Sequence, residues 1–160
     1  LLNLNNSINA LSQLPLKQQL SIREYRQCLA LAQLEALSLL KIAKIKPAKL
    51  TPIPAKFIPK ILKLPNAVFK IISKKMLAID PLARSSMADD LMAGRKTEID
   101  WINGEIVNLA KHLNLNAPIN QKLIQLVKRA ELRSEPKAWS GFELKARLEQ
   151  VSKMRPQKSV

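Results

Sequence analysis

Amide side chains are concentrated at the start of this chain, where they could orient a small polar ligand. Four asparagines, Asn3, Asn5, Asn6 and Asn9, lie within the first nine residues. This density is unusual because asparagine is a mediocre helix former that mostly occupies caps and turns. The cluster is therefore either a ligand-binding edge of a helix or a solvated helical turn, and composition alone leaves both interpretations open.

Two later positions add a hydroxyl and a carboxyl group. Ser85 and Ser86 precede a predicted helix, whose free backbone N–H groups could bind a carboxylate, although N-capping alone also explains a serine there. Glu98 lies at the first turn of the next predicted helix, where the helix dipole favours an acid without any function. Together, amides, a hydroxyl and one carboxyl group would suit proton and hydride chemistry on a 2-keto acid.

Other kinds of site are excluded by residue counts. The chain has only three glycines, Gly94, Gly104 and Gly141, which are too scattered to form a phosphate-binding loop. One cysteine, Cys28, and one histidine, His112, cannot build a disulfide framework or a zinc site. We therefore expect no metal and a reducing, cytoplasmic compartment.

The net charge of +15 predicts attraction to polyanions. A basic nucleic-acid-binding or dimerisation module without catalysis is thus the alternative to an enzyme. However, the basic residues are spread along the chain and aromatic residues make up only 4%, which leaves few platforms for base stacking. No apolar run is long enough to span a membrane, and prolines interrupt the basic segment 41–75. We expect neither nucleic acid nor membrane as a partner.

The elements that position these residues are predicted to be helices. Leu1, Leu4, Ile8 and Leu11 fall on one face of a first helix. The segment Ser21–Glu24 has the spacing of a capping box, and it opens a long helix to about Ile45, before Pro47. Five prolines make 47–65 a loop, with one short helical turn near 57–62.

Five further helices complete the prediction. They are expected at Asn66 to about Leu77, from an N-cap at Ser85 to Gly94, from an N-cap at Thr97 to about Leu113, from Pro118 to about Ala130, and from Ser140 to about Ser152. Residues 153–160 are expected to fray. Because no alternating strand pattern occurs, the predicted fold is all-α.

One long segment resembles the C-terminal signature of ketopantoate reductases. It reads Ser85-Ser-Met-Ala-Asp-Asp-Leu-Met-Ala-Gly-Arg-Lys-Thr-Glu-Ile-Asp-Trp-Ile-Asn-Gly104. The similarity continues in the opening residues 1–11, in 117–120 and 126–128, and in Trp139-Ser-Gly141. The resemblance implies a multi-helix domain like that of ketopantoate reductase and 6-phosphogluconate dehydrogenase, spanning 1–160 as a substrate and dimerisation domain.

The resemblance also implies a two-domain enzyme of which this chain is the C-terminal half. A Rossmann domain, absent from this chain, would bind NADPH, and the cleft between the domains would reduce 2-dehydropantoate, or a related 2-keto acid, for pantothenate and coenzyme A synthesis. The helical domain forms a homodimer in some members. Without its partner domain, the chain is expected to be inactive. Its opening in helical rhythm, with no initiator methionine, is expected for a fragment.

Residue roles follow from the same resemblance. The family's glutamate, which contacts substrate and cofactor, matches Glu98, and its substrate serine matches Ser86. The paired substrate asparagines match Asn5 and Asn9 if Ala10-Leu11 sets the register, whereas counting from a lysine just before Leu1 selects Asn3 and Ser7. The general-acid lysine is absent, and a further substrate asparagine of some members falls near Lys17–Gln19, where there is none.

Overall fold

The computed structural model describes residues 1–48, 52–73 and 80–153, and within these ranges the chain forms only helices, turns and loops. This confirms the predicted all-α fold. The described ranges contain nine α-helices and two short 3-10 helices. The elements are η1 (Leu2–Leu4), α1 (Asn5–Ser12), α2 (Leu16–Ser21), α3 (Arg23–Ile42), η2 (Ala55–Phe57), α4 (Ile58–Leu62), α5 (Asn66–Ile72), α6 (Ser86–Met92), α7 (Ile99–His112), α8 (Pro118–Glu131) and α9 (Gly141–Lys153).

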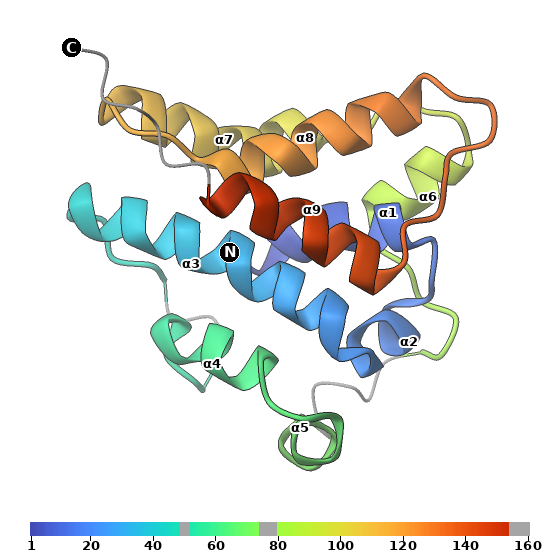
Figure 1. Cartoon of the computed structure of the whole chain (residues 1–160), viewed down its shortest axis with the longest axis horizontal. Coiled ribbons are helices and arrows are strands. Elements are labelled where there is room, and N and C mark those ends of the chain that lie inside the picture. Colours follow the sequence, from blue (N-terminus) through green and yellow to red (C-terminus); the bar gives the residue numbers. More distant parts are fainter. Residues whose placement is uncertain (49–51, 74–79, 154–160) are drawn as a thin grey trace.

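The short helix α1 lies in the middle of the bundle and carries the first candidate residues. It contacts α3, α6 and α8, and Figure 1 shows it behind α9. Leu4, Ile8 and Leu11 are each at most 2% exposed, which confirms the predicted apolar stripe. Because α1 is enclosed, the polar residues on its remaining faces must also find partners inside the protein.

The long helix α3 is the platform on which α4 and α9 pack (Figure 1). The approach of α9 is close at its first residue: a Cβ atom on Gly141 would lie 2.8 Å from Cβ of Glu24. Only glycine lets the two backbones come this near. This contact fixes the direction in which α9 leaves the preceding loop.

The predicted capping box at Ser21 is wrong. Ser21 is the last residue of α2, a helix that the sequence did not predict, and its hydroxyl donates to the carbonyl oxygen of Gln18. The extended residue Ile22 therefore precedes α3 without a side-chain cap. A capping box does form at Ser140 and Glu143, where the Ser140 hydroxyl accepts from the Glu143 N–H and the Glu143 carboxylate accepts from the Ser140 N–H.

The other predicted helix ends are close to the observed ones. Ser85 caps α6 by accepting from the N–H of Ala88, and Gly94, at φ +66°, follows its C-terminus. Helix α7 begins at Ile99, so Glu98 rather than Thr97 is its N-cap residue. Helix α3 ends at Ile42 and not near Ile45, because Lys44 adopts a left-handed conformation at φ 57°.

The predicted C-terminal ends of two helices, α5 and α9, lie next to or beyond the residues that the structure describes. Helix α5 ends at Ile72, whereas the predicted end at Leu77 lies outside the described residues. Lys153 is the last residue of α9, and the rest of the predicted frayed tail also lies outside them.

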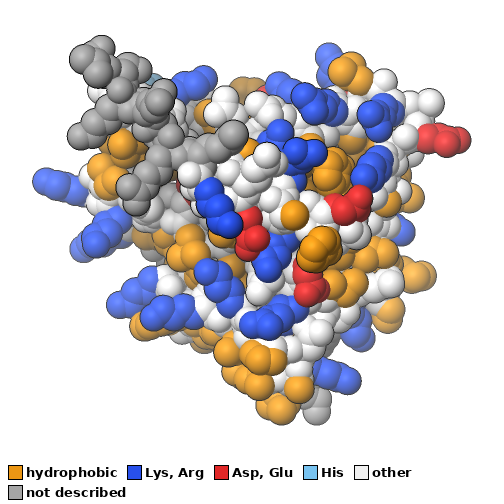
Figure 2. All heavy atoms as spheres, in the orientation of Figure 1, with side chains coloured by type: hydrophobic (Ala, Val, Ile, Leu, Met, Phe, Trp, Pro, Cys, Tyr) orange, Lys and Arg blue, Asp and Glu red, His pale blue; other side chains and the backbone are white. Residues whose placement is uncertain are grey.

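Basic side chains are scattered over the face shown in Figure 2, between apolar patches, and acidic side chains are few there. Within the described ranges, no helix combines the length and the apolar character needed to cross a membrane.

Candidate functional site

Ser86 and Glu98 lie in direct contact although twelve residues separate them. The Ser86 hydroxyl donates to Oε1 of Glu98 at 2.7 Å, and both residues are exposed. Ser86 is the first residue of α6 and Glu98 is the N-cap residue of α7, so the loop through Gly94 brings two helix starts together. The signature segment therefore folds back on itself and presents a hydroxyl and a carboxylate to solvent.

The loop that carries Glu98 is held by the end of α8. Both the backbone N–H and the hydroxyl of Thr97 donate to Oε1 of Glu131, at 2.8 and 2.6 Å. This pair of bonds fixes the residue directly before Glu98. The Thr97 hydroxyl also accepts from the N–H of Ile99 at 3.4 Å, so Thr97 caps the first residue of α7 as predicted, although Glu98 occupies the N-cap position.

Asn9 positions the start of α6. Its side chain is fully buried, and its Oδ1 accepts from the backbone N–H of Ser85 at 2.9 Å. Its Nδ2 donates to the carbonyl oxygen of Leu14 at 2.9 Å. Both polar atoms of this amide are thus used inside the domain, and one of them is bonded to the residue next to Ser86.

Asn5 forms an amide pair with Gln19. The two side chains exchange hydrogen bonds of 3.1 and 3.2 Å, and Gln19 is fully buried while Asn5 is 9% exposed. The family resemblance requires an asparagine near this point of the chain, and the sequence prediction did not consider Gln19. A search for any carboxamide would have found it, because the two residue types offer the same donor and acceptor atoms.

The alternative register has a different environment. Asn3 is exposed in η1, and Ser7 is fully buried with its hydroxyl donating to the carbonyl oxygen of Leu4. Asn6 contacts the start of α6 through its backbone carbonyl oxygen, which accepts from the Ser85 hydroxyl at 3.4 Å. Contacts with the start of α6 thus come from Asn6 and Asn9, not from Asn3 or Ser7.

Arg84 is a cation that sequence reasoning overlooked. It lies two residues before Ser86, is half-buried, and donates from Nη1 to the carbonyl oxygen of Gln13. Among the described residues it has no ion-pair partner. Its position directly before the signature segment was the available signal, because a guanidinium without an acidic partner suits a carboxylate ligand.

The arrangement combines an exposed hydroxyl and an exposed carboxylate in direct contact, with the buried amide of Asn9 bonded to the residue before Ser86 and the cation Arg84 two residues before it. These groups can hold a carboxylate-bearing substrate by hydrogen bonds and place one acidic group beside it. No cluster of potential metal ligands occurs among the residues that the structure describes.

Comparison with known proteins places this geometry in a family context. The family model described as "Ketopantoate reductase PanE/ApbA C terminal" matches residues 1–131. The match includes α1, α6 and α7 and ends with α8. No solved structure shows significant similarity to the chain.

Several curated relatives are each named 2-dehydropantoate 2-reductase. A protein of Pyrococcus horikoshii is 42% identical over 73 residues, covering 42% of this chain and 24% of the relative. A protein of Pyrococcus abyssi is 51% identical over 47 residues, covering 29% of this chain and 16% of the relative. One of Shigella flexneri is 39% identical over 72 residues, covering 40% and 24%. The matched part thus spans about a quarter or less of these relatives.

Proposed function

The chain belongs to the ketopantoate reductase family, whose C-terminal domain it matches, and from this premise we propose that it is the substrate domain of an NADPH-dependent reductase of 2-dehydropantoate or a related 2-keto acid. The observation that carries the proposal is the exposed contact between the Ser86 hydroxyl and the Glu98 carboxylate. A hydroxyl and a carboxylate at 2.7 Å are ready to exchange their mutual bond for bonds to a substrate.

The proposed roles follow from exposure for Ser86 and Glu98, and from the family resemblance for Asn5, which is 9% exposed. Ser86 and Asn5 bind the substrate, and the charge of Arg84 attracts its carboxylate. Glu98 is the catalytic residue that contacts both the substrate and the cofactor. Asn9 is fully buried and bonded to Ser85, so its contribution to substrate binding is made through the position of the adjacent Ser86.

The chemistry of the site limits which part of NADPH this domain can contact. NADPH supplies the hydride when it is bound. The Glu98 carboxylate accepts hydrogen bonds, so it fits hydroxyl or amide groups and repels phosphates. The three glycines form no phosphate-binding loop. In this proposal the phosphates are therefore bound by an N-terminal Rossmann domain, and Glu98 reaches only the reactive end of the cofactor.

The first test is calorimetry of the 160-residue chain with NADPH. We expect no binding in the micromolar range and no turnover of 2-dehydropantoate, because the phosphate-binding loop is missing. The protein that also contains the Rossmann domain should oxidise NADPH in the presence of the keto acid. A micromolar dissociation constant for the 160-residue chain would contradict this division of labour.

The second test concerns Ser86 in the two-domain enzyme. Ser86→Ala should lower kcat/KM for the keto acid by about tenfold or more, since a hydrogen bond to a charged substrate contributes ~1.5–3 kcal/mol. Ser38→Ala, at an exposed position on α3, is the matched control. Equal kcat/KM values for both variants would exclude Ser86 from the substrate site.

A further inference from the structure

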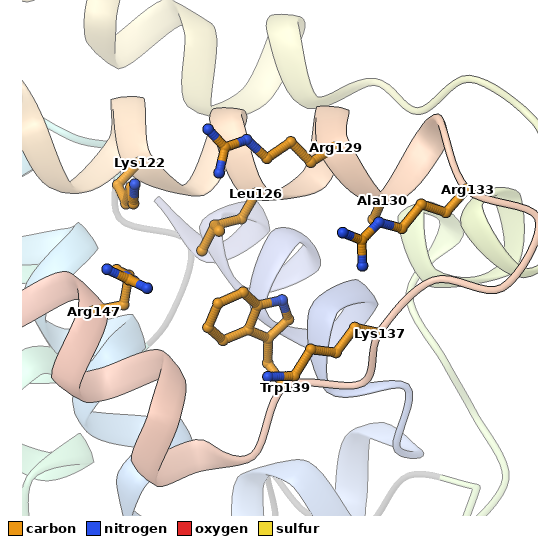
Figure 3. A pocket seen from close by; sticks show the side chains of 8 residues that line it. All are labelled: Lys122, Leu126, Arg129, Ala130, Arg133, Lys137, Trp139 and Arg147. Atoms are coloured by element: carbon orange, nitrogen blue, oxygen red, sulfur yellow. The ribbon is translucent and has the colours of Figure 1, made fainter.

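A second site lies between α8, α9 and the loop that joins them. It is a cavity of about 250 Å³ with five cationic side chains arranged around one indole ring. Figure 3 shows the Trp139 ring in the middle, with Lys122 and Arg147 on one side and Arg133 and Lys137 on the other. The remaining cation is Arg129, on α8. We call this cavity the Trp139 pocket.

The backbone of Trp139 is fixed from two directions. Its N–H donates to the carbonyl oxygen of Leu11, at 2.8 Å, and its own carbonyl oxygen accepts from the Tyr25 hydroxyl at 2.7 Å. The Lys137 ammonium lies 4.7 Å from the centroid of the indole ring. The ring is therefore positioned before any ligand arrives, which lowers the entropy cost of binding.

Most of the pocket's positive charge is not balanced. Only Lys137 has an acidic partner, Glu143, in the described residues, and the masked positions carry no Asp or Glu in the sequence. Within the described ranges, Lys122 and Arg147 bond only to the side-chain oxygens of glutamines. Neither Arg129 nor Arg133 forms an ion pair in the part of the chain that the structure describes.

The cations also repel one another. Burial, together with the charges of Arg147 and Arg129, lowers the pKa of Lys122. An anion bound among these side chains would relieve this repulsion. Three guanidinium groups around one cavity are suited to phosphate oxygens, which arginine binds through two parallel hydrogen bonds.

We propose that the Trp139 pocket binds a compact polyphosphate, that is, a small molecule that ends in two or more adjacent phosphate groups. The two adjacent phosphates of NADPH lie in the middle of the molecule, between its two nucleosides, so NADPH does not meet this condition. The number of unbalanced cations exceeds what one carboxylate or one phosphate can neutralise. The volume lies near the lower end of the range for ligand pockets, ~300–1,000 Å³, so the ligand is small or inserts only its phosphate end. A nucleic acid strand would instead need an extended basic groove with several stacking platforms.

The residues that line the Trp139 pocket are different from those of the proposed substrate site. Arg133, Lys137, Trp139 and Arg147 all lie beyond residue 131, where the family match ends. The Glu131 carboxylate, which follows Ala130 of the pocket wall, accepts from Thr97 and does not line the pocket. Half of the pocket is therefore built by residues beyond the family match, and its ligand need not take part in the reductase reaction.

Tryptophan fluorescence of the 160-residue chain provides the test. Trp101 is 79% exposed and lies outside the pocket, so Trp101→Phe leaves Trp139 as the only tryptophan. Titration with inorganic tripolyphosphate should give a saturable change in Trp139 emission. Tripolyphosphate contains no nicotinamide or keto acid, so the result does not depend on the proposed reductase activity.

Charge-matched variants separate a site from general attraction. Arg129→Gln with Arg133→Gln should weaken tripolyphosphate binding by at least about tenfold, or ~1.4 kcal/mol. Lys17→Gln with Lys46→Gln removes the same charge at exposed positions outside the pocket and should leave the affinity nearly unchanged. If the arginine pair destabilises the fold, Arg147→Gln alone serves as the second variant, because the Arg147 side chain bonds to no described residue other than Gln150.

Parallel titrations identify the source of the phosphates. Similar affinities for ATP and tripolyphosphate would indicate that the phosphate chain is sufficient, and tighter binding of ATP would indicate a nucleotide ligand. The proposal is overturned if tripolyphosphate causes no saturable change in Trp139 emission, or if both double variants lose the same amount of tripolyphosphate affinity. It is also overturned if a single-stranded oligonucleotide binds more tightly than both ATP and tripolyphosphate.

Discussion

Glu98 is the residue whose role is most sharply testable. It is the N-cap residue of α7, but its carboxylate makes no capping bond and instead accepts from Ser86. A carboxylate whose only role is its favourable interaction with the helix dipole contributes roughly 0.3–1 kcal/mol to stability. A carboxylate that contacts the reacting groups has a much larger effect on rate, so the two roles predict separate outcomes.

In the two-domain enzyme, Glu98→Gln should lower kcat/KM by about 10²-fold or more, since it removes a charge beside the reacting carbonyl while keeping the side-chain volume. The melting temperature should change little. Steady-state kinetics and a melting curve are the measurements. Glu105→Gln, at an exposed position on the same helix, is the control. Unimpaired kcat/KM in Glu98→Gln would refute the assignment.

At the scale of elements, α8 is capped by a side chain from another helix. The Glu35 carboxylate on α3 accepts from the N–H groups of Ile119 and Asn120, both at 2.9 Å, and from the Asn120 side chain at 2.8 Å. These N–H groups lie in the first turn of α8, where no local partner exists. Burial raises the pKa of Glu35, although the hydrogen bonds from Asn120 and Ile119 act in the opposite direction.

Glu35→Ala should therefore destabilise the domain by about 1–3 kcal/mol, because it leaves buried donors without an acceptor. Glu35→Gln keeps one acceptor oxygen and should cost less. Urea unfolding at pH 7 would rank the two variants. The control is Glu24→Ala, at a half-buried position in the first turn of α3. If Glu35→Ala lowers the unfolding free energy no more than Glu24→Ala does, the capping role is contradicted.

The raised pKa of Glu35 also predicts a pH dependence. The folded protein holds this proton more tightly than the unfolded chain, so the contribution of Glu35 to stability decreases as pH rises above the ordinary carboxyl pKa of 4.5. Glu35→Gln does not titrate. The difference in unfolding free energy, wild type minus Glu35→Gln, should therefore decrease as the pH is raised from about 4 to 7. A rise over this range would contradict the direction of the shift.

At the scale of the whole molecule, one buried arginine connects the α4–α5 segment to the bundle. Arg26 is fully buried, has no acidic partner in the described ranges, and its guanidinium lies 4.1 Å from the centroid of the Phe69 ring. It donates to the carbonyl oxygens of Leu20, Ser21, Leu62 and Leu64 and to Oδ1 of Asn66. Backbone oxygens from α2, α4 and the following loop thus converge on one side chain.

Arg26→Met should destabilise the chain by more than about 3 kcal/mol, because it leaves several buried carbonyl oxygens without donors. Arg26→Lys should also be destabilised, since an ammonium has three donors and cannot reach all five acceptors. Thermal unfolding gives the measurement, with the exposed Arg23→Lys as control. Wild-type stability in Arg26→Lys would show that the five bonds contribute little.

Much of the fold was predictable from local patterns in the sequence. The apolar stripe of α1, the Ser85 cap, the termination at Gly94 and the start of α8 at Pro118 all depend on residues within one or two helical turns. The signature segment likewise identified Ser86 and Glu98 as candidates and indicated the family. Local patterns failed at Ser21, because a serine can equally well end a helix by bonding to a preceding carbonyl.

Only the tertiary structure decided which groups meet. The Asn5–Gln19 amide pair, the capping of α8 by Glu35, which lies 84 and 85 residues before its partners, and the gathering of Lys122, Trp139 and Arg147 around one cavity all depend on how helices pack. Periodicity fixes which face of a helix is apolar, but it does not specify which distant helix covers that face or which polar atoms become buried there. The same packing buries Asn9 and leaves Ser86 at the surface, a distinction that their shared polarity could not reveal.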